Sequence, residues 1–260
     1  MFPLKDNIPT RRFPVLTLSI IVVCVIVWFF FEESFWNISA TGDERVLEFG
    51  AIPYEITNPG DECAPDQTGT QLVCEGQPGV SGTAPDQAPW WLTIFTSMFM
   101  HGSFLHLAGN MLFLWIFGNN IEDSMGRVRF VVFYLLGGVF ALLGQVAVDP
   151  DAAVPTVGAS GAIAAVLGGY ALLYPRARVI TFVFIIIIFT VVELPALLVL
   201  GLWFLLQLAY GANDIAQPVD GGGVAYFAHL GGFLFGLLAI KLFANNVHED
   251  YESESRIPVY

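Results

Sequence analysis

The sequence predicts an all-α membrane protein in which six transmembrane helices form a bundle, joined by one long and partly irregular external loop. Of its 260 residues, 55% are hydrophobic and 13% are charged, whereas an ordinary soluble domain has roughly 25% charged residues. Apolar runs of about the length that crosses a hydrocarbon core, some 20 residues, occur six times. These runs cover residues 14–31, 104–121, 130–148, 157–173, 193–210 and 224–243.

The first run follows Lys5, Arg11 and Arg12, an arrangement that signal peptides share. Its length and the lack of a small-x-small cleavage site favour an uncleaved first span instead. Residues 1–13 then form a short N-terminal segment, and residues 14–243 form the membrane domain.

A loop of about 60 residues, 32–91, separates the first two runs. Its part from 58 to 89 is rich in Gly, Pro, Asp and Thr, which predicts a flexible segment. Cys63 and Cys74 lie there with ten residues between them, and we expect them to form a structural disulfide because the loop is assigned to the outside. Cys24 lies within the first span and is expected to be a small buried residue.

Residues 179–210 form a continuous apolar stretch of 32 residues, long enough for one span or for two. A second span here would move Lys241 to the outside and His229 to a different depth from Ser160. We therefore expect one span from near Glu193, preceded by an extended segment over residues 179–192.

The charge distribution predicts the topology. The net charge is -13, but with the N-terminus in the cytoplasm all basic residues except Arg45 fall on the cytoplasmic side. Both termini, including the tail 244–260, are therefore expected in the cytoplasm. We expect a multi-pass protein, with the plasma membrane as its location, whose partners are the lipid bilayer and other membrane proteins rather than nucleic acid.

Polar side chains within the spans indicate a functional site, because each needs a partner or a purpose in hydrocarbon. The second, fourth and sixth spans all run from outside to inside. An α-helix rises 1.5 Å per residue, so the polar residues of these three spans come to lie within roughly the outer 5 to 15 Å of the membrane. The polar residues in or next to the spans are His101, His106, Asn110, Gln145, Ser160, Glu193, Gln207 and His229.

Ser160 follows Gly158 and precedes Gly161, so its surroundings are small and its backbone N–H lies at a helix start. Taken alone, Ser160 is better explained as part of a helix-packing face of small residues from Gly158 to Gly169, and we expect Gly161, Ala165 and Gly168 to pack in this way. Gly232 and Gly236 after His229 are expected to form a similar packing face. Taken alone, His229 is as well explained by a bridge between helices. Their convergence with His106 and Asn110, which share a helix face, favours a nucleophile and its base.

No Asp or Glu lies at this depth, so a dyad of Ser160 and His229 is expected. The histidines lack the spacing of a zinc site, and we expect no metal and no cofactor.

The motifs His-x-x-x-x-His-x-x-x-Asn at His101, Gly-x-Ser-Gly at Ser160 and Ala-His-x-x-Gly at His229 resemble those of the rhomboid intramembrane serine proteases, from about residue 90 to 243. The resemblance implies cleavage of transmembrane substrates by Ser160 with His229 as general base. It also implies an oxyanion hole of His106, Asn110 and the Ser160 N–H, a supporting His101, and a fifth span that acts as a lateral gate near Trp203.

Two features depart from the family. Where some members stack an aromatic residue on the histidine, this chain has Ala164, and the first loop lacks a Trp-Arg pair. The alternatives to a protease are a non-catalytic rhomboid-like chaperone and a six-span transporter.

Overall fold

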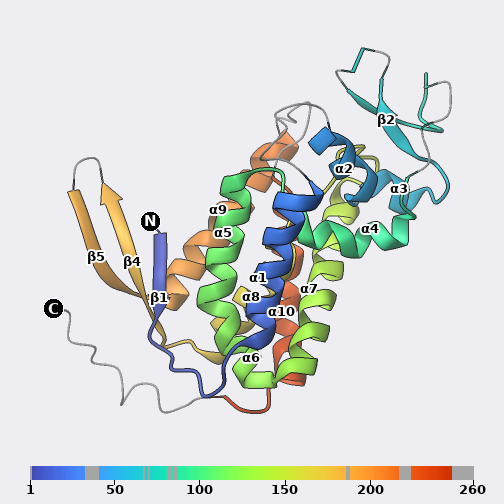
Figure 1. The fold of residues 1–260 in the computed structure, drawn as a ribbon. Coiled ribbons are helices and arrows are strands. Elements are labelled where there is room, and N and C mark those ends of the chain that lie inside the picture. The colour runs from blue at the N-terminus through green and yellow to red at the C-terminus, as the bar shows by residue number, and fades with distance from the viewer. Residues whose placement is uncertain are drawn as a thin grey trace.

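The computed structural model describes residues 2–32, 41–66, 68–69, 71–80, 84, 87–185, 188–216 and 224–247. A bundle of near-parallel helices forms its body, with α8 and α10 at the centre (Figure 1). The helices that correspond to the apolar runs are α1 (Val15–Ile26) with the π-helical turn η1 (Val27–Phe31), α5 (Phe104–Phe113) with η3 (Leu114–Gly118) and α6 (Asn119–Met125), α7 (Arg127–Val148), α8 (Ser160–Leu173), α9 (Ala196–Ala216) and α10 (Tyr226–Phe243).

These helices differ in length. By length and composition, α7, α9 and α10 can each cross a membrane, whereas residues 15–31 and α8 form shorter apolar helices. The helical bundle is therefore confirmed, and the count of six spans stays a prediction.

The all-α prediction is wrong in part, because the described chain contains two small sheets. Strands β1 (Phe2–Asp6), β4 (Arg178–Ile185) and β5 (Ile188–Pro195) form an antiparallel sheet in the order β1-β4-β5. This sheet lies beside the bundle (Figure 1). The extended structure predicted for 179–192 is confirmed over the described residues 179–185 and 188–192, as their β-branched and aromatic side chains favour. The following helix begins at Ala196, three residues after Glu193, because Glu193 still pairs with Ile180 in the sheet.

The first loop contains more structure than its composition predicts. The composition of residues 58–89 predicts a flexible segment, yet β2 (Cys63–Pro65) pairs with β3 (Leu72–Cys74). The predicted disulfide joins Cys63 to Cys74, and both side chains are fully buried. This cross-link ties the two strands together. The other described elements between η1 and α5 are α2 (Thr41–Phe49), α3 (Pro53–Thr57), α4 (Trp90–Thr96) and the 3-10 turn η2 (Ser97–Phe99).

Small residues bring α8 and α10 into backbone contact. A Cβ at Gly168 would lie 2.1 Å from the carbonyl oxygen of Phe233, and one at Gly232 would lie 2.1 Å from that of Gly161. A Cβ at Gly236 would lie 2.0 Å from the oxygen of Ala165. The packing predicted for these glycines is thus confirmed.

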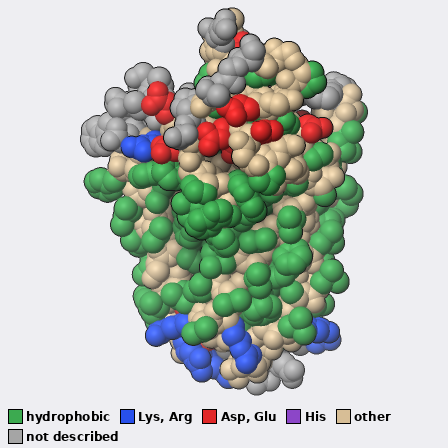
Figure 2. All heavy atoms as spheres, turned by 90° about the vertical axis from the view of Figure 1, so that its right-hand side faces the viewer, with side chains coloured by type: hydrophobic (Ala, Val, Ile, Leu, Met, Phe, Trp, Pro, Cys, Tyr) green, Lys and Arg blue, Asp and Glu red, His purple; other side chains and the backbone are tan. Residues whose placement is uncertain are grey.

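Charges separate to the two ends of the molecule. Acidic side chains gather at one end and basic ones at the other, with an apolar belt between them (Figure 2). Two of the basic residues stand at helix ends, Arg127 at the start of α7 and Lys241 in the last turn of α10. This pattern is that of a protein whose belt lies in a bilayer.

Asp6 at the end of β1 is buried between helices. It accepts hydrogen bonds from the Tyr170 hydroxyl at 2.7 Å and from Asn120 Nδ2 at 2.5 Å. Burial raises the pKa of Asp6 from 3.8 to about 7, against the opposing effect of the Tyr170 hydrogen bond. The folded state therefore holds a proton that the unfolded state releases.

This shift predicts the pH dependence of stability. The contribution of Asp6 is fully present below about pH 4 and is lost as the pH rises through about 7. We expect the unfolding temperature of the wild-type protein in detergent to fall between pH 5 and pH 8. The unfolding temperature of the Asp6→Asn variant should fall less over the same range. Thermal unfolding of both proteins across this range checks the prediction, and parallel pH profiles would contradict it.

Candidate active site

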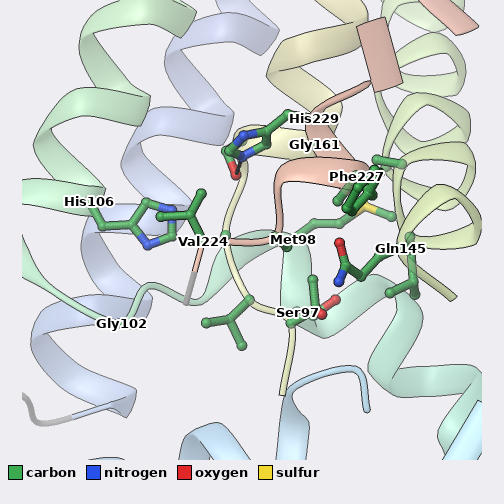
Figure 3. A pocket seen from close by; sticks show the side chains of 18 of the residues that line it. Ser97, Met98, Gly102, His106, Gln145, Gly161, Val224, Phe227 and His229 are labelled. Atoms are coloured by element: carbon green, nitrogen blue, oxygen red, sulfur yellow. Dashed lines mark hydrogen bonds between the residues drawn. The ribbon is translucent and has the colours of Figure 1, made fainter. Parts of the chain in front are cut away.

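A cavity of about 930 Å³ lies between the helices. Its lining reaches from Leu167 and Trp203 inside the bundle to Asp149 and Asp214 at the acidic end. His106, Gln145 and His229 lie around it on three different helices (Figure 3). The cavity thus joins the polar residues within the spans to the acidic end of the protein.

Ser160 and His229 meet in this cavity. His229 Nε2 lies 2.8 Å from Ser160 Oγ. Ser160 is the first residue of α8, and His229 is the fourth residue of α10. Because the glycines bring the two helices into backbone contact, these short side chains can reach each other. A serine at hydrogen-bond distance from an imidazole can lose its proton to it and act as a nucleophile.

His106 and Asn110 lie on α5 beside this pair. Gly158, with φ of 127°, packs so closely that an added Cβ would lie 2.7 Å from His106 Nε2 and 3.4 Å from Ser160 Oγ. Asn110 is 8% exposed and lines the cavity, and its Nδ2 has no hydrogen-bond partner among the described residues. A buried donor without a partner is costly, so this one can serve an acceptor that enters the cavity.

The sequence-family model of the rhomboid domain matches residues 88–246, a range that includes His106, Asn110, Gly158, Ser160 and His229. The chain belongs to the rhomboid family. It is accordingly an integral membrane protein.

Several rhomboid proteins are similar to this chain. Rhomboid protein 1, mitochondrial, of Saccharomyces cerevisiae is 34% identical over 157 residues, which cover 56% of this chain and 40% of that protein. The human presenilin-associated rhomboid-like protein, mitochondrial, is 32% identical over 155 residues, 54% of this chain and 35% of that protein. Rhomboid protease GluP of Bacillus subtilis is 39% identical over 88 residues, 34% of this chain and 16% of that protein.

The matched part of this chain spans less than half the length of each of these relatives. Two of their names state a mitochondrial location. The expectation of a plasma membrane location therefore finds no support in the comparisons.

His101, predicted to support the rhomboid site, is fully buried before α5. Its ring packs edge-on against His106, with centroids 5.2 Å apart. Its backbone N–H donates to both carboxylate oxygens of Glu32, at 3.1 and 3.2 Å. Burial lowers the pKa of His101 to about 3, so the ring is neutral at pH 7. His101 thus fixes the position of His106, and Glu32, to which the sequence assigned no role, holds the segment that carries both.

Gly158 and Gly161, the other predicted site residues, make close packing contacts. Gly158 makes room for His106, as described above. A Cβ at Gly161 would lie 2.6 Å from the Cβ of Ala141 on α7, so Gly161 sets the distance between α8 and α7.

Two residues of α9 contact His229, and the sequence assigned neither a place beside it. The Trp203 ring lies 5.7 Å from the imidazole, centroid to centroid, with 38° between the planes. Gln207 Oε1 lies 2.8 Å from His229 Nδ1. Their spacing of four residues and the polarity of Gln207 in an apolar span were visible in the sequence. The face of α9 that turns toward α10 was not.

Proposed function

We propose that the chain is a serine endopeptidase that cleaves transmembrane segments of other membrane proteins. The observation that carries the proposal is the distance of 2.8 Å between Ser160 Oγ and His229 Nε2 inside a cavity of about 930 Å³. Similarity to Rhomboid protease GluP of Bacillus subtilis supports the same activity.

Ser160 Oγ attacks the carbonyl carbon of the scissile peptide bond while His229 Nε2 accepts its proton. The tetrahedral intermediate collapses to an acyl-enzyme when His229 returns this proton to the leaving amine. Water then attacks the ester, again with His229 as base, and releases the second product. His106, Asn110 and the backbone N–H of Ser160 donate hydrogen bonds to the oxyanion.

The bilayer orientation follows from the same proposal. We place the basic end, with residues 1–13 and 244–260, in the cytoplasm by the positive-inside rule, and we keep residues 14–243 as a six-span domain. The structure does not describe residues 248–260. The acidic end of the cavity then faces outward, and water reaches Ser160 from there. A substrate helix must unwind near its outer end to present a peptide bond.

Asn110→Ala is expected to lower kcat about 100-fold without stopping cleavage, because His106 and the Ser160 N–H still bind the oxyanion. Asn110 Nδ2 makes no hydrogen bond within the described residues, so the folded state loses little. Cleavage of a single-span substrate in proteoliposomes gives kcat, and the unfolding temperature controls for folding. A destabilised variant would instead assign Asn110 a structural role.

A fluorophosphonate probe tests the proposed function directly. An activated serine reacts with the probe, and we expect labelling of the wild type at Ser160, identified by peptide mass spectrometry. A non-catalytic chaperone or a transporter has no reason to react. An unlabelled, folded wild-type protein would therefore refute the serine mechanism.

A further inference from the structure

We propose that Gln207 on α9 is the positioning residue of the catalytic base, and that it holds His229 in the tautomer that can take the proton of Ser160. This inference rests on the proposed function. It makes the fifth span part of the catalytic apparatus and extends the expected dyad by a neutral third group.

The hydrogen-bond chain runs from Ser160 through His229 to Gln207. Ser160 Oγ lies 2.8 Å from Nε2, and Gln207 Oε1 lies 2.8 Å from Nδ1. Nε2 can accept a proton only if the neutral ring carries its hydrogen on Nδ1. A carbonyl oxygen accepts from Nδ1–H, so the contact with Oε1 selects this tautomer. The same dipole stabilises the imidazolium that forms during attack.

Gln207 places a carboxamide on the side of α9 that contacts α10, between aromatic contacts. Phe204 packs on Phe233 with ring centroids 4.8 Å apart, and Tyr210 packs on Tyr226 at 5.7 Å. A polar group in the apolar interface between α9 and α10 is costly unless it has a hydrogen-bond partner, and His229 supplies one. An ionised carboxylate at this depth would cost more to bury than a carboxamide, which explains a glutamine where soluble serine proteases use an aspartate.

Trp203 contacts the same histidine one helical turn earlier. Its ring centroid also lies 6.1 Å from that of Phe233, so the Trp203 ring contacts both Phe233 and the imidazole of His229. Trp203 thereby supplies the aromatic contact that Ala164 cannot make. Because Trp203 and Gln207 sit at i and i+4, a single helix fixes both the tilt of the ring and its hydrogen bond.

The position of α9 therefore governs the base. Of the 18-residue apolar window in α9, 17% is buried inside the protein, against 39% for α10, so α9 is less firmly packed. When α9 separates from α10, His229 loses Trp203 and Gln207 together. Cleavage then requires α9 to be seated on α10 at the moment of proton transfer, even if a substrate displaces it on entry.

The experiment compares three variants of the full-length protein in proteoliposomes with a single-span substrate. Gln207→Leu removes the acceptor and keeps the volume, and we expect kcat to fall about 10-fold to 100-fold with little change in KM. Asn213→Leu is the matched control, since it makes the same chemical change at an exposed position of α9, and wild-type kinetics are expected.

Gln207→Glu distinguishes positioning from packing. A carboxylate can only accept from Nδ1–H, and we expect cleavage to persist with the acidic limb of the pH profile moved up by about one pH unit or more. The other titratable side chains around the cavity, His106 on α5, Asp149 after α7 and Asp214 on α9, are the same in every variant. A shift between variants therefore comes from position 207.

Three outcomes would overturn the inference. One is Gln207→Leu with wild-type kcat, and the second is Gln207→Glu with an unshifted pH profile. The third is loss of activity in both variants together with a lowered unfolding temperature, which would make Gln207 structural. Failure of the proposed function looks different, because the wild-type protein itself would then neither cleave substrate nor react with fluorophosphonate at Ser160.

Discussion

Replacing Ser160 by alanine should lower the rate of substrate cleavage by about 10⁴-fold or more while the protein stays folded. The change removes the nucleophile, and among the described hydroxyl groups that line the cavity Ser160 Oγ is the one hydrogen-bonded to His229. The structural cost is small, because Ser160 Oγ makes one hydrogen bond, to His229, and the half-buried site is lined by small residues. Loss of one such bond changes the free energy of unfolding by about 1 kcal/mol.

Cleavage of a single-span substrate in proteoliposomes measures this effect, and the unfolding temperature shows that the fold is retained. Ser19→Ala is the matched control, since Ser19 on α1 likewise makes one hydrogen bond, to the carbonyl oxygen of Val15 at 2.7 Å. Wild-type activity is expected for this control. Cleavage by Ser160→Ala at a comparable rate would remove the serine mechanism.

The proximity of Ser160 and His229 was predictable from short sequence patterns around each residue. The length of each apolar run gave the depth of its polar residues, and the glycines after each motif residue indicated which helices pack closely. Gln207 and Trp203 were not predictable in the same way. Gln207 was visible as a polar residue in the otherwise apolar stretch 196–210, but no sequence pattern indicated which helix its face turns toward.

The sheet beside the bundle shows a similar limit. The β-branched and aromatic residues from Val179 to Val192 predicted an extended segment, and its strands β4 and β5 pair as a hairpin. Its third strand comes from residues 2–6, far away in sequence, and no local signal indicates such a partner. The segment is apolar on both faces, so period-two alternation could not set its register. In the first loop, the disulfide was predicted from compartment and spacing, whereas the pairing of β2 with β3 was not.

Gly236→Ala should destabilise the protein and lower its activity, although the residue lies two turns from His229 along α10. The added Cβ would lie 2.0 Å from the backbone oxygen of Ala165, and a backbone atom cannot move aside as a flexible side chain can. The helices must separate, at a cost of about 1 to 3 kcal/mol. His229 lies at i-7 on the same face, so it moves away from Ser160, and a misplacement of about 1 Å can cost about 100-fold in rate. Gly201→Ala on α9 is the matched control, because nothing lies within 4 Å of the added Cβ and alanine favours the helix.

The unfolding temperature and the cleavage rate of both variants test this prediction. A Gly236→Ala protein with wild-type stability and rate would show that the backbone contact between α8 and α10 does not set the distance from serine to histidine.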